Sequence, residues 1–341
     1  MRVAVVGLGY WGPKLLRNLV TMLGVDAVVA VEARAEQRAE QAAAFPGVEF
    51  VETLDGALAD GDVRAVVVAT PVETHATLAR QALEAGRHVL VEKPLAGSVP
   101  EAEALAALAA KRGLVLMVGH TFLFSPRVEC VRSHIEEDGI GPIHYVTSSR
   151  LNLGIHRSDA NVIWDLAPHD FSIVFHLLQE FPVVVHAMAH GVVRHDLPDV
   201  AFINMTFPSG ALASVSVSWL APRKVRNTTV VGERSMIVFD DTQADEPVKI
   251  YDKGVDVMDS ADFAENQLTY RSGPTVAPHI VATEPLLIEL QHFIEAVGGA
   301  RPVRSDGAFG LEVVRALETA DRSWREGGVP MSVDRSSPLV G

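Results

Sequence analysis

The chain has 341 residues, of which 48% are hydrophobic, and a formal net charge of −14, so we expect two soluble domains with sizeable cores. The negative charge and the lack of clustered Lys and Arg argue against nucleic acid or an anionic membrane surface as a partner, and no apolar run reaches membrane-spanning length. The single cysteine, Cys130, excludes an internal disulfide and a cysteine-based metal cluster; we expect no metal site and a reducing compartment, the cytoplasm.

The N-terminus is an apolar strand that leads directly into a glycine-rich turn. The turn reads Gly7-Leu8-Gly9-Tyr10-Trp11-Gly12, and Pro13 and an apolar helical pattern follow it. Gly7 permits the tight turn, Gly9 lets the backbone approach a pyrophosphate, and Gly12 lets the helix pack closely on the strand. Glycines alone are as typical of an ordinary turn, but the strand before them and the helix after them favour a dinucleotide site at the helix N-terminus.

A second apolar run, 25–31, ends in Glu32 at the spacing from Gly12 that is typical of a ribose-binding acid. A carboxylate here suits the ribose hydroxyls of NAD and would repel a ribose phosphate, so NAD is the predicted cofactor. Arg34 keeps NADP possible, because an arginine nearby could receive the extra phosphate.

Strands and helices continue to alternate up to about residue 120. Apolar strands are predicted at 63–69, 88–91 and 114–118, with helices between them. This alternation predicts an α/β Rossmann domain over residues 1–120, with a doubly wound parallel sheet. Ligands of such sheets bind at the carboxyl ends of the strands, where this chain carries Glu32, Thr70, Pro71, Glu92, Lys93 and His120.

The pattern changes after about residue 120. Short strands without intervening helices are predicted at 143–149, 183–189, 201–207, 211–219, 228–231 and 236–239, and two helices are predicted near the end of the chain, at 287–297 and 311–320. This order predicts that residues 121–341 form an α+β domain, an open, mostly antiparallel sheet packed by helices.

The second domain contains the segment Trp164-Asp165-Leu166-Ala167-Pro168-His169. Pro168 suits the first turn of a helix, so Asp165 is predicted to cap that helix and to lie close to His169. A capping aspartate and a solvated histidine are equally typical of such a segment. Histidine is nevertheless the side chain suited to accept and return a proton near neutral pH, as a dehydrogenase acting on an alcohol requires.

Arg223, Lys224 and Arg226 form the densest local positive charge of the chain. They could hold a diphosphate or a carboxylate, or they could protect a solvated strand edge. Arg150, Asn152 and Arg157 are further candidates for binding sugar hydroxyls.

Taken together, these motifs resemble the glucose-fructose oxidoreductase and inositol dehydrogenase family (Gfo/Idh/MocA). The resemblance runs over nearly the whole chain and rests on the glycine turn, Ala69-Thr70-Pro71 with His75, Glu92-Lys93-Pro94, and Asp165-x-x-x-His169. It implies that Lys93 and His169 flank the reacting carbon opposite the nicotinamide, with Asp165 as a partner of the substrate or the histidine, and that the Lys93–Pro94 bond is cis. It also implies cofactor contacts at Tyr10, Trp11, Thr70, Pro71, His75, Glu92, Lys93 and His120.

Segments 150–154, 164–169 and 219–226 are similar to the branch of the family that acts on nucleotide-linked sugars, which implies substrate contacts at Trp164 and at the basic residues named above. After Gly119 the chain departs from the aromatic, asparagine and arginine of many members, which disfavours a simple sugar or inositol as substrate. The resulting hypothesis is reversible, NAD(P)-dependent hydride transfer at a sugar carbinol carbon, and C3 of a nucleotide-linked sugar or sugar uronate is the favoured position.

Two alternatives remain open: a free-sugar, inositol or dihydrodiol dehydrogenase, and a non-catalytic dinucleotide-sensing regulator, because a fold does not fix a function. The presence of Lys93 and His169 counts against the regulator. The resemblance further implies a homodimer or homotetramer, with the open sheet face as the contact.

Overall fold

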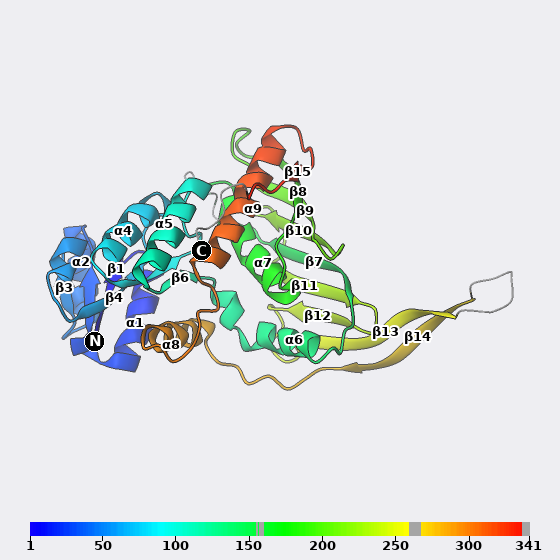
Figure 1. Ribbon diagram of the computed structural model, residues 1–341, viewed down its shortest axis with the longest axis horizontal. Helices are drawn as coiled ribbons and strands as arrows, with labels where there is room; N and C mark the ends of the chain where they lie inside the picture. The colour runs from blue at the N-terminus through cyan, green and yellow to red at the C-terminus, as the bar shows by residue number, and fades with distance from the viewer. Residues whose placement is uncertain (155, 157–159, 259–266, 336–341) are drawn as a thin grey trace. The chain divides into compact units, whose positions relative to one another are not determined.

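A computed structural model describes residues 1–154, 156, 160–258 and 267–335 (Figure 1). The chain folds into two compact units. The N-terminal unit contains Met1–Phe124 and Thr283–Arg315, and the sheet unit contains Ser125–Ala282 and Ala316–Asp334. Arg335 also belongs to the N-terminal unit, and one boundary between the units, Arg315/Ala316, falls within the helix α9 (Gly307–Arg325).

The N-terminal unit is built on a six-stranded parallel sheet with the order β3-β2-β1-β4-β5-β6. The strands are β1 (Arg2–Val6), β2 (Val28–Val31), β3 (Glu49–Val51), β4 (Val63–Val68), β5 (His88–Glu92) and β6 (Leu116–Gly119). The strand order reverses between β1 and β4, which is where doubly wound sheets bind their ligands. The predicted Rossmann architecture is confirmed.

Helices connect these strands: α1 (Gly12–Leu23), α2 (Ala35–Ala44), α3 (Leu54–Leu58), α4 (Val72–Glu84) and α5 (Val99–Arg112). The apolar run at 25–31 is only partly a strand, since Val25–Ala27 form a short 3-10 turn before β2. A second such turn, Thr121–Phe124, follows β6.

After the strands of the sheet unit, residues Thr283–Arg315 belong to the N-terminal unit again. Helix α8 (Pro285–Val297) packs beside α1, and its apolar side chains Leu286, Leu290 and Phe293 share a core with those of α1. The predicted C-terminal domain, residues 121–341, included this helix. Periodicity identified the helix but carried no signal for the core that it joins.

The sheet unit has a nine-stranded sheet in the order β14-β13-β12-β11-β7-β10-β9-β8-β15. Its strands are β7 (Ile143–Leu151), β8 (Val184–His190), β9 (Val200–Thr206), β10 (Leu212–Ser218), β11 (Val225–Gly232), β12 (Met236–Asp240), β13 (Val248–Met258), β14 (Gln267–Val276) and β15 (Met331–Ser332). Only the β7–β10 pair among the described strands of this sheet is parallel, so the predicted mostly antiparallel sheet is confirmed.

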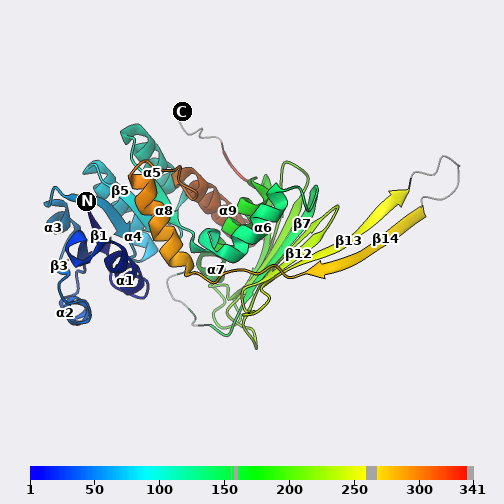
Figure 2. The ribbon, with the colours of Figure 1, turned by 90° about the horizontal axis from the view of Figure 1, so that it is seen from below.

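Helices α6 (Pro126–Glu136) and α7 (Val162–Leu178) cover one face of this sheet (Figures 1 and 2). Side chains alternate accordingly: in β9, Ala201, Ile203 and Met205 are buried, whereas Phe202 is 51% exposed. Strands β13 and β14 extend together beyond the rest of the sheet. Among the described residues, no helix has the length and apolar character needed to cross a membrane.

Candidate functional site

The glycine turn between β1 and α1 has the geometry that its spacing predicts. Gly7 has a φ of 88°, and a Cβ at Gly12 would lie 2.1 Å from the Gly7 carbonyl oxygen, so neither position tolerates a side chain. A Cβ at Gly9 would meet no atom within 4 Å in the described structure. The surface at Gly9 is therefore open to a ligand, although a pyrophosphate there stays a prediction.

Two aromatic side chains lie on the outside of this turn. Tyr10 is 78% exposed and Trp11 is 37% exposed, and their rings meet edge to face with centroids 5.6 Å apart. The Lys14 ammonium lies 3.7 Å from the centre of the Tyr10 ring and 4.3 Å from that of Trp11, which are cation–π distances. The predicted contact of both residues with a dinucleotide would thus be made beside a positive charge.

Glu32 is nearly buried at the end of β2, and its carboxylate is fixed on two sides. It accepts a hydrogen bond from the Leu8 N–H at 2.9 Å, and it accepts the backbone N–H and the Nε of Arg34 at 3.0 Å each. Burial raises the pKa of Glu32, but the bonds from Arg34 and Leu8 outweigh it and the net shift is downward. A carboxylate is therefore present at the position where the sequence predicts a ribose-binding acid.

His75, a predicted cofactor contact, is only 1% exposed. Its Nδ1 lies 2.8 Å from the Pro94 carbonyl oxygen and its Nε2 lies 2.9 Å from the Thr70 carbonyl oxygen. Both ring nitrogens thus face backbone carbonyls. The Lys93–Pro94 bond is cis, as the resemblance implied.

Three ionisable side chains gather behind the carboxyl ends of β5 and β6. The Glu92 carboxyl packs over Gly119, where a Cβ would lie 3.3 Å from Glu92 Oε2, and burial raises the pKa of Glu92 to about 7. His120 is 1% exposed, its ring nitrogens have no hydrogen-bond partner in the described part of the chain, and burial lowers its pKa to about 3. Both residues were predicted as cofactor contacts.

The third member, Glu289 of α8, was not anticipated from the sequence. It is fully buried and accepts a hydrogen bond from Thr121 Oγ1 at 2.9 Å. Burial, followed by the neighbouring Glu92, raises the pKa of Glu289 well above its ordinary value. A single Glu on an amphipathic helix gives no sequence signal of this kind.

The helix that carries His169 begins earlier than predicted. Asn161 is the N-cap of α7, since its Oδ1 accepts the N–H groups of Ile163 and Trp164 at 3.0 and 3.1 Å. Pro168 consequently lies inside the helix, and the prediction that Asp165 is the cap is wrong. The capping signal was an asparagine ahead of Val162, which the proline obscured.

Asp165 instead connects α7 to the end of β10. Its Oδ2 accepts the indole N–H of Trp219 at 3.0 Å, and Trp219 is almost fully buried. Asn152 follows β7 at the same end of the sheet, where its N–H bonds to the Ser218 carbonyl at 3.1 Å. His169, partly exposed on α7, and Trp164, partly exposed in its first turn, belong to this same end of the sheet unit.

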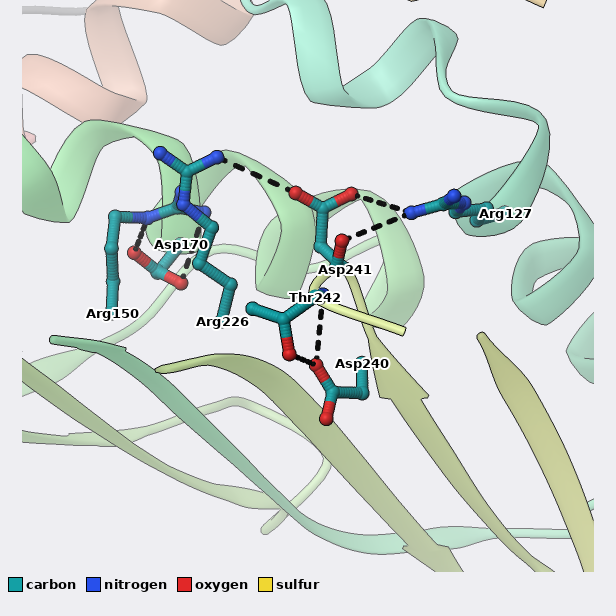
Figure 3. Close-up of polar contacts among 7 residues, drawn as sticks. All are labelled: Arg127, Arg150, Asp170, Arg226, Asp240, Asp241 and Thr242. Carbon is teal, nitrogen blue, oxygen red and sulfur yellow. Dashed lines mark hydrogen bonds and ion pairs between the residues drawn. The ribbon is translucent and has the colours of Figure 1, made fainter. Parts of the chain in front are cut away.

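Arg150 is buried rather than presented to solvent. Its Nε donates to Asp170 Oδ2 at 2.7 Å (Figure 3). Ser148 donates to the other oxygen of Asp170, also at 2.7 Å. Since Asp170 follows His169 directly, this pair ties β7 to the helix that carries the histidine.

Arg226 lies opposite Arg150 in the β11–β7 register. It shares one carboxylate, Asp241, with Arg127: the Arg226 and Arg127 nitrogens lie 3.5 and 3.1 Å from Asp241 (Figure 3). Two guanidinium groups therefore meet a single carboxylate. Because β11 is an inner strand between β12 and β7, Arg226 does not protect a strand edge.

The remaining predicted residues are less informative. Arg223 and Lys224 are exposed just before β11. Arg157 lies outside the described residues. Within the part of the chain that the structure describes, no cluster of His, Cys, Asp and Glu could hold a metal ion.

The chain matches known proteins over both units. Residues 1–120 match the oxidoreductase family with an NAD-binding Rossmann fold, and residues 128–238 match the GFO/IDH/MocA C-terminal domain. The UDP-N-acetylglucosamine 3-dehydrogenase of Acidithiobacillus ferrooxidans is 31% identical, over 93% of this chain and 95% of that protein. A solved structure of that enzyme aligns with a TM-score of 0.80 at 27% identity, covering 95% of this chain and 97% of the other.

Two further relatives cover nearly the whole chain. The structure of GenD2 from gentamicin A biosynthesis, in complex with NAD, aligns with a TM-score of 0.80 at 27% identity, over 98% of this chain and 96% of GenD2. The scyllo-inositol 2-dehydrogenase (NAD(+)) of Bacillus subtilis is 28% identical over 100% of this chain and 98% of that protein. The chain belongs to the GFO/IDH/MocA family and is an NAD-binding oxidoreductase.

Proposed function

We propose that this oxidoreductase transfers a hydride reversibly between nicotinamide and C3 of a nucleotide-linked sugar or sugar uronate. The proposal is supported by similarity to the UDP-N-acetylglucosamine 3-dehydrogenase. The structural observation that carries it is the pair of guanidinium groups, Arg127 and Arg226, which share the single carboxylate of Asp241 on the unit that bears His169.

The charges favour a polyanionic substrate. Asp170 already balances Arg150 in a buried ion pair, and like charges on directly opposite strand residues are unfavourable, so Arg226 needs a second anion. Asp241 neutralises the charge of Arg226 only in part, because it also forms an ion pair with Arg127. A diphosphate would supply the remaining negative charge and could accept two parallel hydrogen bonds from a guanidinium. A free sugar or inositol offers no such group.

The chemistry is assigned to three side chains. In the oxidation direction His169 takes the proton of the substrate hydroxyl, and Lys93 hydrogen-bonds the same oxygen and stabilises its developing negative charge. Asp165, held by Trp219, contacts the substrate or the histidine. A bound nicotinamide would supply the acceptor or the donor of the hydride that the carbinol carbon exchanges. The carboxylate of Glu32 fits the ribose hydroxyls, and the close-packed turn at Gly7 and Gly12 fits a pyrophosphate.

A substrate panel tests the proposal. UDP- and dTDP-linked sugars and their uronates, with free N-acetylglucosamine and inositol for comparison, are followed by nicotinamide absorbance with NAD and with NADP. We expect turnover only with nucleotide-linked substrates. Comparable turnover of a free sugar or of inositol would contradict the assignment.

Arg226→Ala tests the diphosphate contact separately. The loss of a charged hydrogen bond should raise the KM for the nucleotide sugar by about tenfold or more and leave NAD affinity unchanged. Arg234→Ala is the matched control, since Arg234 pairs with Asp138 near the start of β12. An unchanged KM in Arg226→Ala would remove Arg226 from the substrate site.

We further propose that two or four copies associate through the uncovered face of the sheet unit, where Tyr145, Met188, Phe202 and Leu212 are each more than two-fifths exposed. The cytoplasmic location and the absence of nucleic-acid or membrane partners stay predictions.

A further inference from the structure

His75 is buried between two loops, one of which carries the backbone next to Lys93. It lies in the first turn of α4, and its ring spans the gap between two loops that leave neighbouring strands of the parallel sheet. One loop, after β4, supplies the Thr70 carbonyl, and the other, after β5, supplies the Pro94 carbonyl. Pro94 directly follows Lys93.

The first of these loops is itself in contact with the glycine turn. A Cβ placed on Gly7 would lie 2.6 Å from the Thr70 side chain and 2.8 Å from the Ala69 carbonyl oxygen. The Ala69 N–H also bonds to the Val6 carbonyl at 2.8 Å. A continuous path of close contacts therefore runs from the glycine turn through Thr70 and the His75 ring to the backbone that carries Lys93.

We propose that His75 is a positioning residue, which sets the place of Lys93 relative to the glycine turn by bridging the loops that carry the Thr70 and Pro94 carbonyls, with its N–H donated to one carbonyl at a time. This inference rests on the proposed function, because it gives His75 its effect through Lys93. The bridge is enclosed, since Pro94 is buried and His75 is 1% exposed, so water does not replace it at low cost.

The charge environment fits a residue that positions its neighbours rather than one that donates a proton to the substrate. Burial lowers the pKa of His75 and so does the nearby charge of Lys93, whereas the two carbonyls raise it. In the neutral form the ring donates one N–H, to one carbonyl at a time. Either form keeps the ring between the two loops.

The test is a double-mutant cycle between His75→Phe and Lys93→Met. Phenylalanine keeps a ring but has no N–H, so neither carbonyl can accept a hydrogen bond from residue 75. A misplacement of about 1 Å can cost about a hundredfold in rate, and we expect His75→Phe to lower kcat by at least about tenfold while the Kd for NAD, measured by calorimetry, changes little. In the Lys93→Met background the same substitution should change the residual kcat by less than about twofold.

Two further variants separate positioning from general damage. His75→Gln provides an amide N–H donor and should recover part of the lost kcat. His88→Phe is the matched control: His88 is a partly buried histidine at the opposite end of β5, where its Nδ1 accepts the Val115 N–H at 3.0 Å, and its loss should leave kcat unchanged. If His75→Phe does not fold, the cycle is run with His75→Asn, whose shorter amide cannot span both carbonyls.

The outcomes are distinct. Equal fold-losses from the His75 substitution with and without Lys93 would overturn the inference and make His75 merely structural. Near wild-type turnover in Lys93→Met would instead overturn the proposed function, whatever His75 does.

Discussion

Glu32 is the residue that we expect to set the cofactor preference. Its carboxylate is held in place by Leu8 and Arg34, and Arg34 is held away from the role of phosphate receptor by the same bonds. The unaltered protein should therefore use NAD in preference to NADP, because the fixed carboxylate repels a ribose phosphate.

Glu32→Ala should release Arg34. The preference for NAD, measured as kcat/KM with NAD divided by kcat/KM with NADP, should fall by about tenfold or more. Glu52→Ala is the control, since Glu52 is exposed, lies beyond β3 and pairs only loosely with Arg38, at 3.5 Å. A preference for NADP in the unaltered protein would refute the role given to Glu32.

Glu92 links protein stability to pH. Burial raises its pKa from about 4.5 to about 7, so the folded protein binds this proton more tightly than the unfolded chain does. The resulting stabilisation is fully present below pH 4.5 and is lost as the pH rises to about 7, by roughly 1 to 3 kcal/mol.

Glu92→Gln removes the contribution that protonation of Glu92 makes to stability. The Tm of this variant should match the wild type near pH 5 and exceed it near pH 8, with Glu73→Gln on the exposed first turn of α4 as the control. Equal Tm differences at both pH values would show that Glu92 ionises normally.

Helix α7 is the element that presents His169, and its start depends on one side chain. Asn161 accepts two N–H groups of the first turn and donates to Asp321 at 2.6 Å. Asn161→Ala should lower the free energy of unfolding by about 1 to 2 kcal/mol, measured by urea denaturation.

Asp165→Asn provides the comparison with Asn161→Ala that tests which residue caps α7. Asp165 is not the cap, and an amide oxygen could still accept the Trp219 N–H, so this variant should lose little stability. A larger loss in Asp165→Asn than in Asn161→Ala would reverse the assignment of the cap.

Local signals in the sequence were sufficient for most elements of the N-terminal unit. Alternation of strands and helices predicts the parallel sheet, and glycine spacing predicts the turn, because both are set by short-range geometry. The position of α8 was not predictable, because it depends on a core shared with α1, far away in the chain. The sequence also did not predict that Arg226 lies opposite Arg150, because that position follows from strand register rather than from sequence spacing.

For the molecule as a whole, association through the uncovered sheet face has a direct test. Phe202→Asp places a charge among exposed apolar side chains on that face, which should disfavour burial against a second copy. Light scattering after size exclusion should show a dimer or tetramer for the wild type and a smaller species for the variant. A wild-type monomer would contradict the proposal.

Lys93 of the N-terminal unit and His169 of the sheet unit are proposed to act on one substrate oxygen. The measurement is the rate of nicotinamide reduction with the best nucleotide sugar for Lys93→Met, His169→Ala and the double variant. NAD affinity and Tm serve as controls. Each single variant should keep NAD affinity and lose turnover by roughly a hundredfold or more, and the double variant should lose little beyond the worse single one, because residues that act as a unit are not additive. Near wild-type turnover in either single variant would contradict a shared catalytic role for Lys93 and His169.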